Sequence, residues 1–149
     1  MKTYVITLSR VFPVSHRKAG TPTGFAGKLG KTKIHTIRAN YELWKARFAE
    51  IEKGNACLSI RQWLDKPYAS KQVEVARLTK QDGIGIQMLT FPPYGASIEA
   101  RQATIDGKPY PREVIAENDG YHLEDWREWF KNYNFDKPLA VIHFGAFRY

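Results

Sequence analysis

The sequence predicts an α+β fold in which five to seven short strands form a small curved sheet or barrel flanked by two main helices. Two stretches, residues 41–53 and 122–133, place apolar side chains at helical spacing. Short runs of alternating or β-branched residues lie around them, separated by glycine and proline turns. The chain has 149 residues, 43% of them hydrophobic, so we expect one packed domain spanning residues 1–149.

Both main helices have signals for their start or end. Asn40 is a suitable N-cap for the first helix, and Lys53-Gly54 supplies its stop. A shorter helix is expected over residues 113–118, closed by Gly120. We assign the aromatic residues at core spacing to packing; they are Trp44 and Phe48 in the first helix and Trp126 and Phe130 in the second.

The expected strands occupy both ends and the middle of the chain. The loop over residues 12–31 is rich in glycine, proline, threonine and basic side chains, with room for one short helical turn. Pro109 and Pro111 exclude a regular central strand at that point. The predicted strands are residues 3–8, 33–38, 56–63, 72–78, 84–91, 97–105 and 139–147.

The net charge of +8 lies entirely in the first 41 residues, which hold eight Lys or Arg and no acid. The rest of the chain carries equal numbers of basic and acidic side chains. A local positive field of this kind favours an anionic partner, and nucleic acid is the first candidate. Trp63, Tyr68 and Tyr94 fall near predicted loops, where they either stack a base or cover an end of the barrel.

Other features limit the class of protein. Cys57 is the only cysteine, so no intrachain disulfide forms, and we expect it to be a small buried strand residue. The N-terminus lacks the apolar run of a signal peptide and no stretch reaches membrane-spanning length, so we expect a soluble cytoplasmic protein. The four histidines show no metal-ligand spacing, and no dinucleotide or phosphate-loop pattern is present. We therefore expect no metal, no cofactor and no membrane contact.

The segment Lys33 to Arg38 is the first candidate for chemistry. In an extended strand Thr36 and Arg38 share a face, and Lys33 lies on the other unless the strand bends or begins there. A lysine beside a hydroxyl serves as a base or oxyanion partner when burial or nearby positive charge lowers its pKa. The alternative, which the pattern alone favours, is a basic and solvated strand edge.

The turn Glu117-Asn118-Asp119-Gly120 is the second candidate. We expect Asp119 to cap the helix that follows and Glu117 to be a solvated acid. If this turn folds against the basic strand, Glu117 meets Lys33 instead. One acid and one amine in a cleft then share the proton transfers of an amide hydrolysis.

The segment Gly30-Lys31-Thr32-Lys33-Ile34-His35-Thr36-Ile37-Arg38, with its Lys-x-x-Thr-Ile-Arg pattern, resembles the signature of ASCH domains, a branch of the PUA-like superfamily. Gly54 to Leu58 after the first helix, and Glu117-Asn118 ahead of Trp126, are similar to later parts of that family. The resemblance implies a small PUA-like β-barrel with a basic cleft that binds RNA or a modified nucleoside or nucleotide.

One bacterial branch of this family consists of amidohydrolases that deacetylate N4-acetylcytidine. By position, the resemblance implies Lys33 as base, Thr36 as nucleophile and Glu117 as proton donor. We expect ligand contacts from Lys31, Arg38, Asn118, Trp63 and Tyr94. The chain departs from the branch at Ala39, where the branch has an acid, and in its longer N-terminal loop and its insert at residues 91–110.

Three functions follow from the sequence. The leading hypothesis is a domain whose basic cleft binds RNA or a modified nucleoside. The alternative is an amidohydrolase that acts on N4-acetylcytidine or a related small amide through Lys33, Thr36 and Glu117. The third is an interaction module whose basic N-terminal loop docks an acidic protein.

Overall fold

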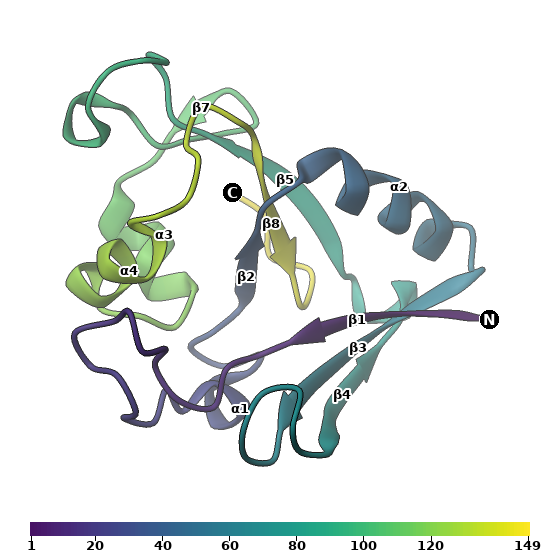
Figure 1. The fold of residues 1–149 in the computed structure, drawn as a ribbon. Helices are drawn as coiled ribbons and strands as arrows, with labels where there is room; N and C mark the ends of the chain where they lie inside the picture. The colour runs from purple at the N-terminus through teal and green to yellow at the C-terminus, as the bar shows by residue number, and fades with distance from the viewer.

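The computed structural model describes residues 1–149 and shows an α+β fold with two sheets and four helices (Figure 1). The strands are β1 Lys2–Thr7, β2 His35–Arg38, β3 Ala56–Trp63, β4 Gln72–Leu78, β5 Gly85–Thr90, β6 Thr104–Ile105, β7 Lys108–Pro109 and β8 Leu139–His143. The α-helices are α1 Phe25–Lys28, α2 Tyr41–Glu52, α3 Arg112–Asn118 and α4 Leu123–Phe130. Two short 3-10 helices cover Lys80–Asp82 and Ile98–Ala100.

The strands form two separate sheets. The first has the order β1-β3-β4, with β1 parallel to β3 and β4 antiparallel to it. The second has the order β2-β8-β5-β6-β7 and is antiparallel throughout. No strand of one sheet pairs with a strand of the other, so the structure shows an α+β fold but not a closed barrel. The first and last strands, β1 and β8, belong to different sheets.

Most predicted elements are confirmed to within a few residues, and one strand is wrong. Residues 97–105 form the 3-10 helix Ile98–Ala100 and then only the two-residue strand β6. The Arg112 guanidinium accounts for the difference, because its Nη2 donates to the carbonyls of Ile98 and Arg101. Those carbonyls therefore bond to a side chain and not to a neighbouring strand.

Strand β8 of the second sheet is buried on both faces, which explains its apolar run. Ala140 and Ile142 contribute to a core shared with the first sheet, α1 and α2. Leu139 and Val141 contribute to a second core with α3 and α4. Side chains alternate between the two faces of a strand, so each of the first four residues of β8 faces a hydrophobic layer. As predicted, Cys57 is buried in β3, with 1% of its surface exposed.

A buried polar network lies at the end of β8. His143 Nε2 donates to Gln87 Oε1 at 3.0 Å, because the Gln87 amide nitrogen is engaged by Asp106 Oδ2. His143 Nδ1 is buried without a hydrogen-bond partner. Burial, and then the nearby His35 and Arg148, lower the pKa of His143 to about 3. The native protein therefore holds a neutral imidazole at this position down to acidic pH.

Stability should fall as the pH decreases from about 6.5 to about 3, because the unfolded chain binds a proton at His143 that the native protein excludes. The free energy of unfolding should change with pH by up to about 1.4 kcal/mol per pH unit. Urea unfolding between pH 7 and 5.5 measures this slope, because Asp and Glu side chains stay mostly ionised over that range. His143→Gln should remove most of the slope, and the exposed His122→Gln should leave it intact. An unchanged slope in His143→Gln would contradict this assignment.

Candidate functional site

The candidate site lies between the edges of the two sheets. Strands β1 and β2 are edge strands of their respective sheets, and Arg38 Nη2 bridges them by donating to the Thr7 carbonyl at 3.0 Å. Beside this bridge is a small cavity with a volume of about 40 Å³, which we call the inner cavity. Its walls come from β1, α1, β2 and α4 and from the segment joining α3 to α4. Its polar lining includes Thr7, Ser9, Lys33, Thr36, Arg38 and Asp119.

Lys33 and Asp119 form a buried ion pair in the wall of this cavity. Lys33 Nζ donates to Asp119 Oδ1 at 2.8 Å and to the Asp119 carbonyl at 2.7 Å. The two side chains are 2% and 1% exposed. The ammonium also lies 4.4 Å from the ring centroid of Phe25 and 5.2 Å from that of Tyr121. Hydrogen bonds and aromatic faces thus replace the water that this charge loses.

Local backbone pairing places Asp119 opposite Lys33. The amide of Ile34 donates to the Asn118 carbonyl at 2.9 Å, and Lys33 and Asp119 form an isolated antiparallel bridge. Gly120 follows with a φ of +85°, and a Cβ there would lie 2.9 Å from Lys33 Cβ. Only glycine therefore permits both this backbone conformation and this close approach.

The Asp119 carboxylate also has neighbours other than Lys33. Trp126 Nε1 donates to Asp119 Oδ2 at 3.1 Å. His35 Nε2 is hydrogen-bonded to the Tyr149 hydroxyl at 2.7 Å, and its Nδ1 lies 3.7 Å from Asp119 Oδ1. His35 and Thr36 are neighbours in β2, so their side chains face opposite sides of the strand. The carboxylate is therefore held by hydrogen bonds from Lys33 and Trp126, whereas His35 Nδ1 is buried without a hydrogen-bond partner.

Two basic side chains that line the inner cavity, Lys33 and Arg38, have lowered pKa values. Burial lowers the pKa of Lys33 from its ordinary value, against the opposing effect of Asp119, and Arg38 and Lys28 lower it further. Burial also lowers the pKa of the Arg38 guanidinium, whose Nε is buried without a partner. The buried Thr36 side chain makes no hydrogen bond within the chain, in contrast to Thr7 and Thr23. A hydroxyl and a guanidinium N–H are thus free beside a desolvated amine.

A larger depression, with a volume of about 300 Å³, adjoins the inner cavity, and we call it the outer groove. Residues 7–9 and Arg38 line both spaces. The outer groove also has two aromatic walls, Trp63 and Tyr68, whose ring centroids are 5.2 Å apart. Tyr68 is 91% exposed. The predicted ligand residues Trp63 and Arg38 therefore line the same groove.

Glu117, the predicted proton donor, is not brought to this site. It is an exposed residue of α3 and lines a separate groove with Lys28 and Thr32. The carboxylate that contacts Lys33 belongs to Asp119, which was expected to cap the next helix. That cap prediction is wrong, because α4 follows His122 and has no side-chain cap. The sequence signal for Asp119 was its position directly before Gly120, where the chain can approach another segment closely.

The remaining predicted ligand residues lie outside the inner cavity and outer groove. Lys31 is exposed and its side chain makes no hydrogen bond. Asn118 Nδ2 donates to the Tyr149 hydroxyl at 3.0 Å, so Asn118 has a structural partner. Tyr94 is 56% exposed, in the loop after β5. Of the predicted set, the structure brings together Lys33, Thr36, Arg38 and Trp63.

The basic N-terminal segment folds against acids of the same chain. Figure 1 shows the segment after β1 running beside α4. Arg17 Nη2 lies 3.1 Å from Asp125 Oδ1 and 3.3 Å from Glu124 Oε2, and Lys18 Nζ lies 2.7 Å from Asp125 Oδ2. Lys28 Nζ donates to the Gly120 carbonyl at 3.1 Å. Part of the local positive charge is therefore neutralised within the molecule.

A scan against models of protein families, a search of curated proteins and a search of solved structures each found no match to this chain. The site is therefore interpreted from its own geometry. The structure contains no group of three or more His, Cys, Asp or Glu side chains arranged to hold a metal ion. None of its helices has the length and apolar character needed to cross a membrane.

Asp119→Ala should destabilise the protein by about 3–5 kcal/mol, because it leaves the Lys33 ammonium buried without its counter-charge. Chemical unfolding monitored by tryptophan fluorescence gives this value. Glu117→Ala removes a carboxylate two residues away that has no partner, so it should change stability by less than about 0.5 kcal/mol. Equal effects of the two substitutions would show that the pair with Lys33 is not what makes Asp119 important.

Proposed function

We propose that this chain binds a nucleobase-bearing molecule, with the base in the outer groove and a small substituent or polar edge reaching the inner cavity. The observation that carries the proposal is that these two spaces share part of their lining, residues 7–9 and Arg38. The outer groove, at about 300 Å³, is at the lower end of the range of small-molecule sites. The inner cavity, at about 40 Å³, has room for one small group only.

The chemistry of each space suits one part of such a ligand. Trp63 and Tyr68 offer aromatic faces on which a base stacks without regard to its identity. Arg38, Thr36 and Lys33 then offer N–H and O–H groups to a carbonyl or amide. The resemblance of residues 30–38 to the ASCH signature supports the same assignment, because the key residues of that signature line the inner cavity. On this basis we also propose a PUA-like relationship for the fold.

A single nucleoside or nucleotide fits these observations better than a long RNA. Binding along an RNA backbone depends on a continuous set of unpaired Lys and Arg side chains. Arg17 and Lys18, at the centre of the basic segment, are already paired with Asp125. The same pairing weighs against docking of an acidic protein on this loop.

Amide hydrolysis is the second candidate function, and the free Thr36 hydroxyl beside a lysine of lowered pKa favours it. In this reaction Lys33 first gives up a proton to solvent, which its lowered pKa favours, and Thr36 Oγ1 then attacks the amide carbon while the neutral amine takes its proton. Arg38 Nε donates to the oxygen on which negative charge develops. Lys33 returns the proton to the leaving nitrogen, and water then hydrolyses the acyl-threonine ester, releasing the carboxylic acid. Asp119, and not Glu117, orients Lys33 in this scheme.

Ligand binding is tested by titrating the protein with N4-acetylcytidine and with cytidine in a calorimeter. Trp63→Ala should weaken binding by about 5- to 150-fold, the equivalent of about 1–3 kcal/mol for one stacked base. Tyr94→Ala is the matched control, since it removes an exposed aromatic ring outside both spaces, and its affinity should equal that of the unmodified protein. Equal affinities of the two variants would contradict the proposed site.

Hydrolysis is tested by measuring acetate released from N4-acetylcytidine. Thr36→Val keeps the side-chain shape but removes the nucleophile, so it should abolish acetate release. Asp119→Asn should lower the rate by about 10²- to 10⁴-fold, because Lys33 loses the group that orients it. Glu117→Gln should retain the full rate. Binding without acetate release would leave the binding function standing and reject the amidohydrolase, and loss of activity in Glu117→Gln would contradict the role of Asp119.

A further inference from the structure

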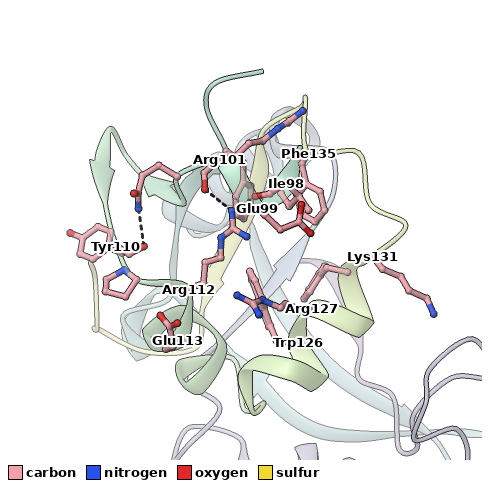
Figure 2. Close-up of a pocket in the computed structure, with 14 residues that line it drawn as sticks. Ile98, Glu99, Arg101, Tyr110, Arg112, Glu113, Trp126, Arg127, Lys131 and Phe135 are labelled. Atoms are coloured by element: carbon pink, nitrogen blue, oxygen red, sulfur yellow. Dashed lines mark hydrogen bonds between the residues drawn. The ribbon is translucent and has the colours of Figure 1, made fainter. Parts of the chain in front are cut away.

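A second pocket lies on the other side of α4, away from the inner cavity and the outer groove. It has a volume of about 560 Å³ and is enclosed by the segment from Phe91 to Arg112 together with α3, α4 and the chain after α4. Figure 2 shows side chains from these elements converging on it. Its apolar lining includes the aromatic rings of Phe91, Trp126, Phe130 and Phe135. The proposed function makes no use of this pocket.

Four cationic side chains line the pocket, and two of them are already paired. Arg101 Nη2 lies 2.8 Å from Asp136 Oδ1, and Lys131 Nζ lies 2.7 Å from Glu128 Oε1. Both carboxylates lie outside the set of residues that line the pocket. These two cations are therefore engaged by the protein itself.

The other two cations, Arg112 and Arg127, form no ion pair. Arg112, at the start of α3, uses Nη2 for two backbone carbonyls, and its guanidinium lies 5.6 Å from the ring centroid of Phe91. Arg127, an exposed residue of α4, makes no hydrogen bond within the chain. Figure 2 shows both guanidinium groups at the centre of the pocket.

The two guanidinium groups also influence each other. Burial lowers the pKa of Arg112, and the positive charge of Arg127 lowers it further, while the acids Glu99 and Glu113 act in the opposite direction. Those two acids line the pocket but lie within 4.0 Å of no basic side-chain nitrogen. The two guanidinium groups therefore have no carboxylate of the chain as an ion-pair partner.

We propose that this pocket binds a small aromatic anion, with a phosphate or carboxylate between Arg112 and Arg127 and a ring against Ile98 and Phe135. An anion there relieves the repulsion between the two guanidinium groups and gains charge-assisted hydrogen bonds from the free N–H groups. Ile98 and Phe135 are partly exposed and supply the apolar area for the ring, and a volume of about 560 Å³ is ample for such a ligand. The site is independent of the proposed nucleobase site.

Trp126 gives the pocket a built-in reporter. Its ring lines the pocket, and its Nε1–H is fixed to Asp119 Oδ2. The probe is phenyl phosphate, titrated into ¹⁵N-labelled protein with amide and indole resonances followed by NMR. Saturable shifts are expected at the Trp126 indole and at residues 98–112. Phenol and inorganic phosphate each lack half of the ligand, so each should bind at least about tenfold more weakly than phenyl phosphate. A parallel titration with benzoate shows whether the pocket prefers a carboxylate or a phosphate.

Arg127→Gln is the decisive variant, since Arg127 is exposed and bonds to nothing that the fold needs. It should weaken phenyl phosphate binding by about tenfold or more. Lys45→Gln, which removes one positive charge from an exposed site on α2, should leave binding unchanged. Equal affinity in Arg127→Gln and the unmodified protein, shifts confined to the outer groove, or no saturable shifts with either phenyl phosphate or benzoate would overturn the proposal.

Discussion

A lysine charge buried almost completely inside the protein is the constraint on which this structure depends. Lys33 cannot remain charged in an apolar interior without a counter-charge and hydrogen-bond acceptors. Asp119 supplies both, from a position 86 residues further along the chain. To do so, the turn after α3 must lie against the segment before β2. The ion pair thereby fixes α3 and α4 beside the gap between the two sheets, and it creates the polar wall of the inner cavity.

The same rule of charge matching explains the unusual distribution of charge along the sequence. The N-terminal segment has no acid of its own, and Arg17 and Lys18 find their counter-charges on α4. Charge asymmetry between parts of a chain is thus resolved partly by folding and not only by an external partner. The cationic groups that remain without a partner are informative for that reason. Arg38 Nε beside the inner cavity, and Arg127 in the pocket lined by Trp126, are the positions at which we propose that an external carbonyl or anion binds.

The sequence predicted most elements of the fold because their signals are local. The apolar spacing of α2, its Asn40 cap and the Asp65-Lys66-Pro67-Tyr68 turn between β3 and β4 all act over a few residues. The polar residues of the site depend on long-range pairing, and there the prediction was less accurate. Glu117 and Asp119 are both acids in one turn, and only the backbone bridge to Lys33 decides which carboxylate is buried. The failed strand at residues 97–105 likewise depends on a distant side chain, Arg112.

A double-mutant cycle between Lys33 and Asp119 tests the central claim most directly. Unfolding free energies are measured for Lys33→Met, Asp119→Leu and the double variant. If each side chain is buried only because the other is present, the double variant should be less destabilised than the sum of the single variants, by about 2–3 kcal/mol. Additive effects would contradict the account, because they would show that Lys33 and Asp119 are buried independently of each other.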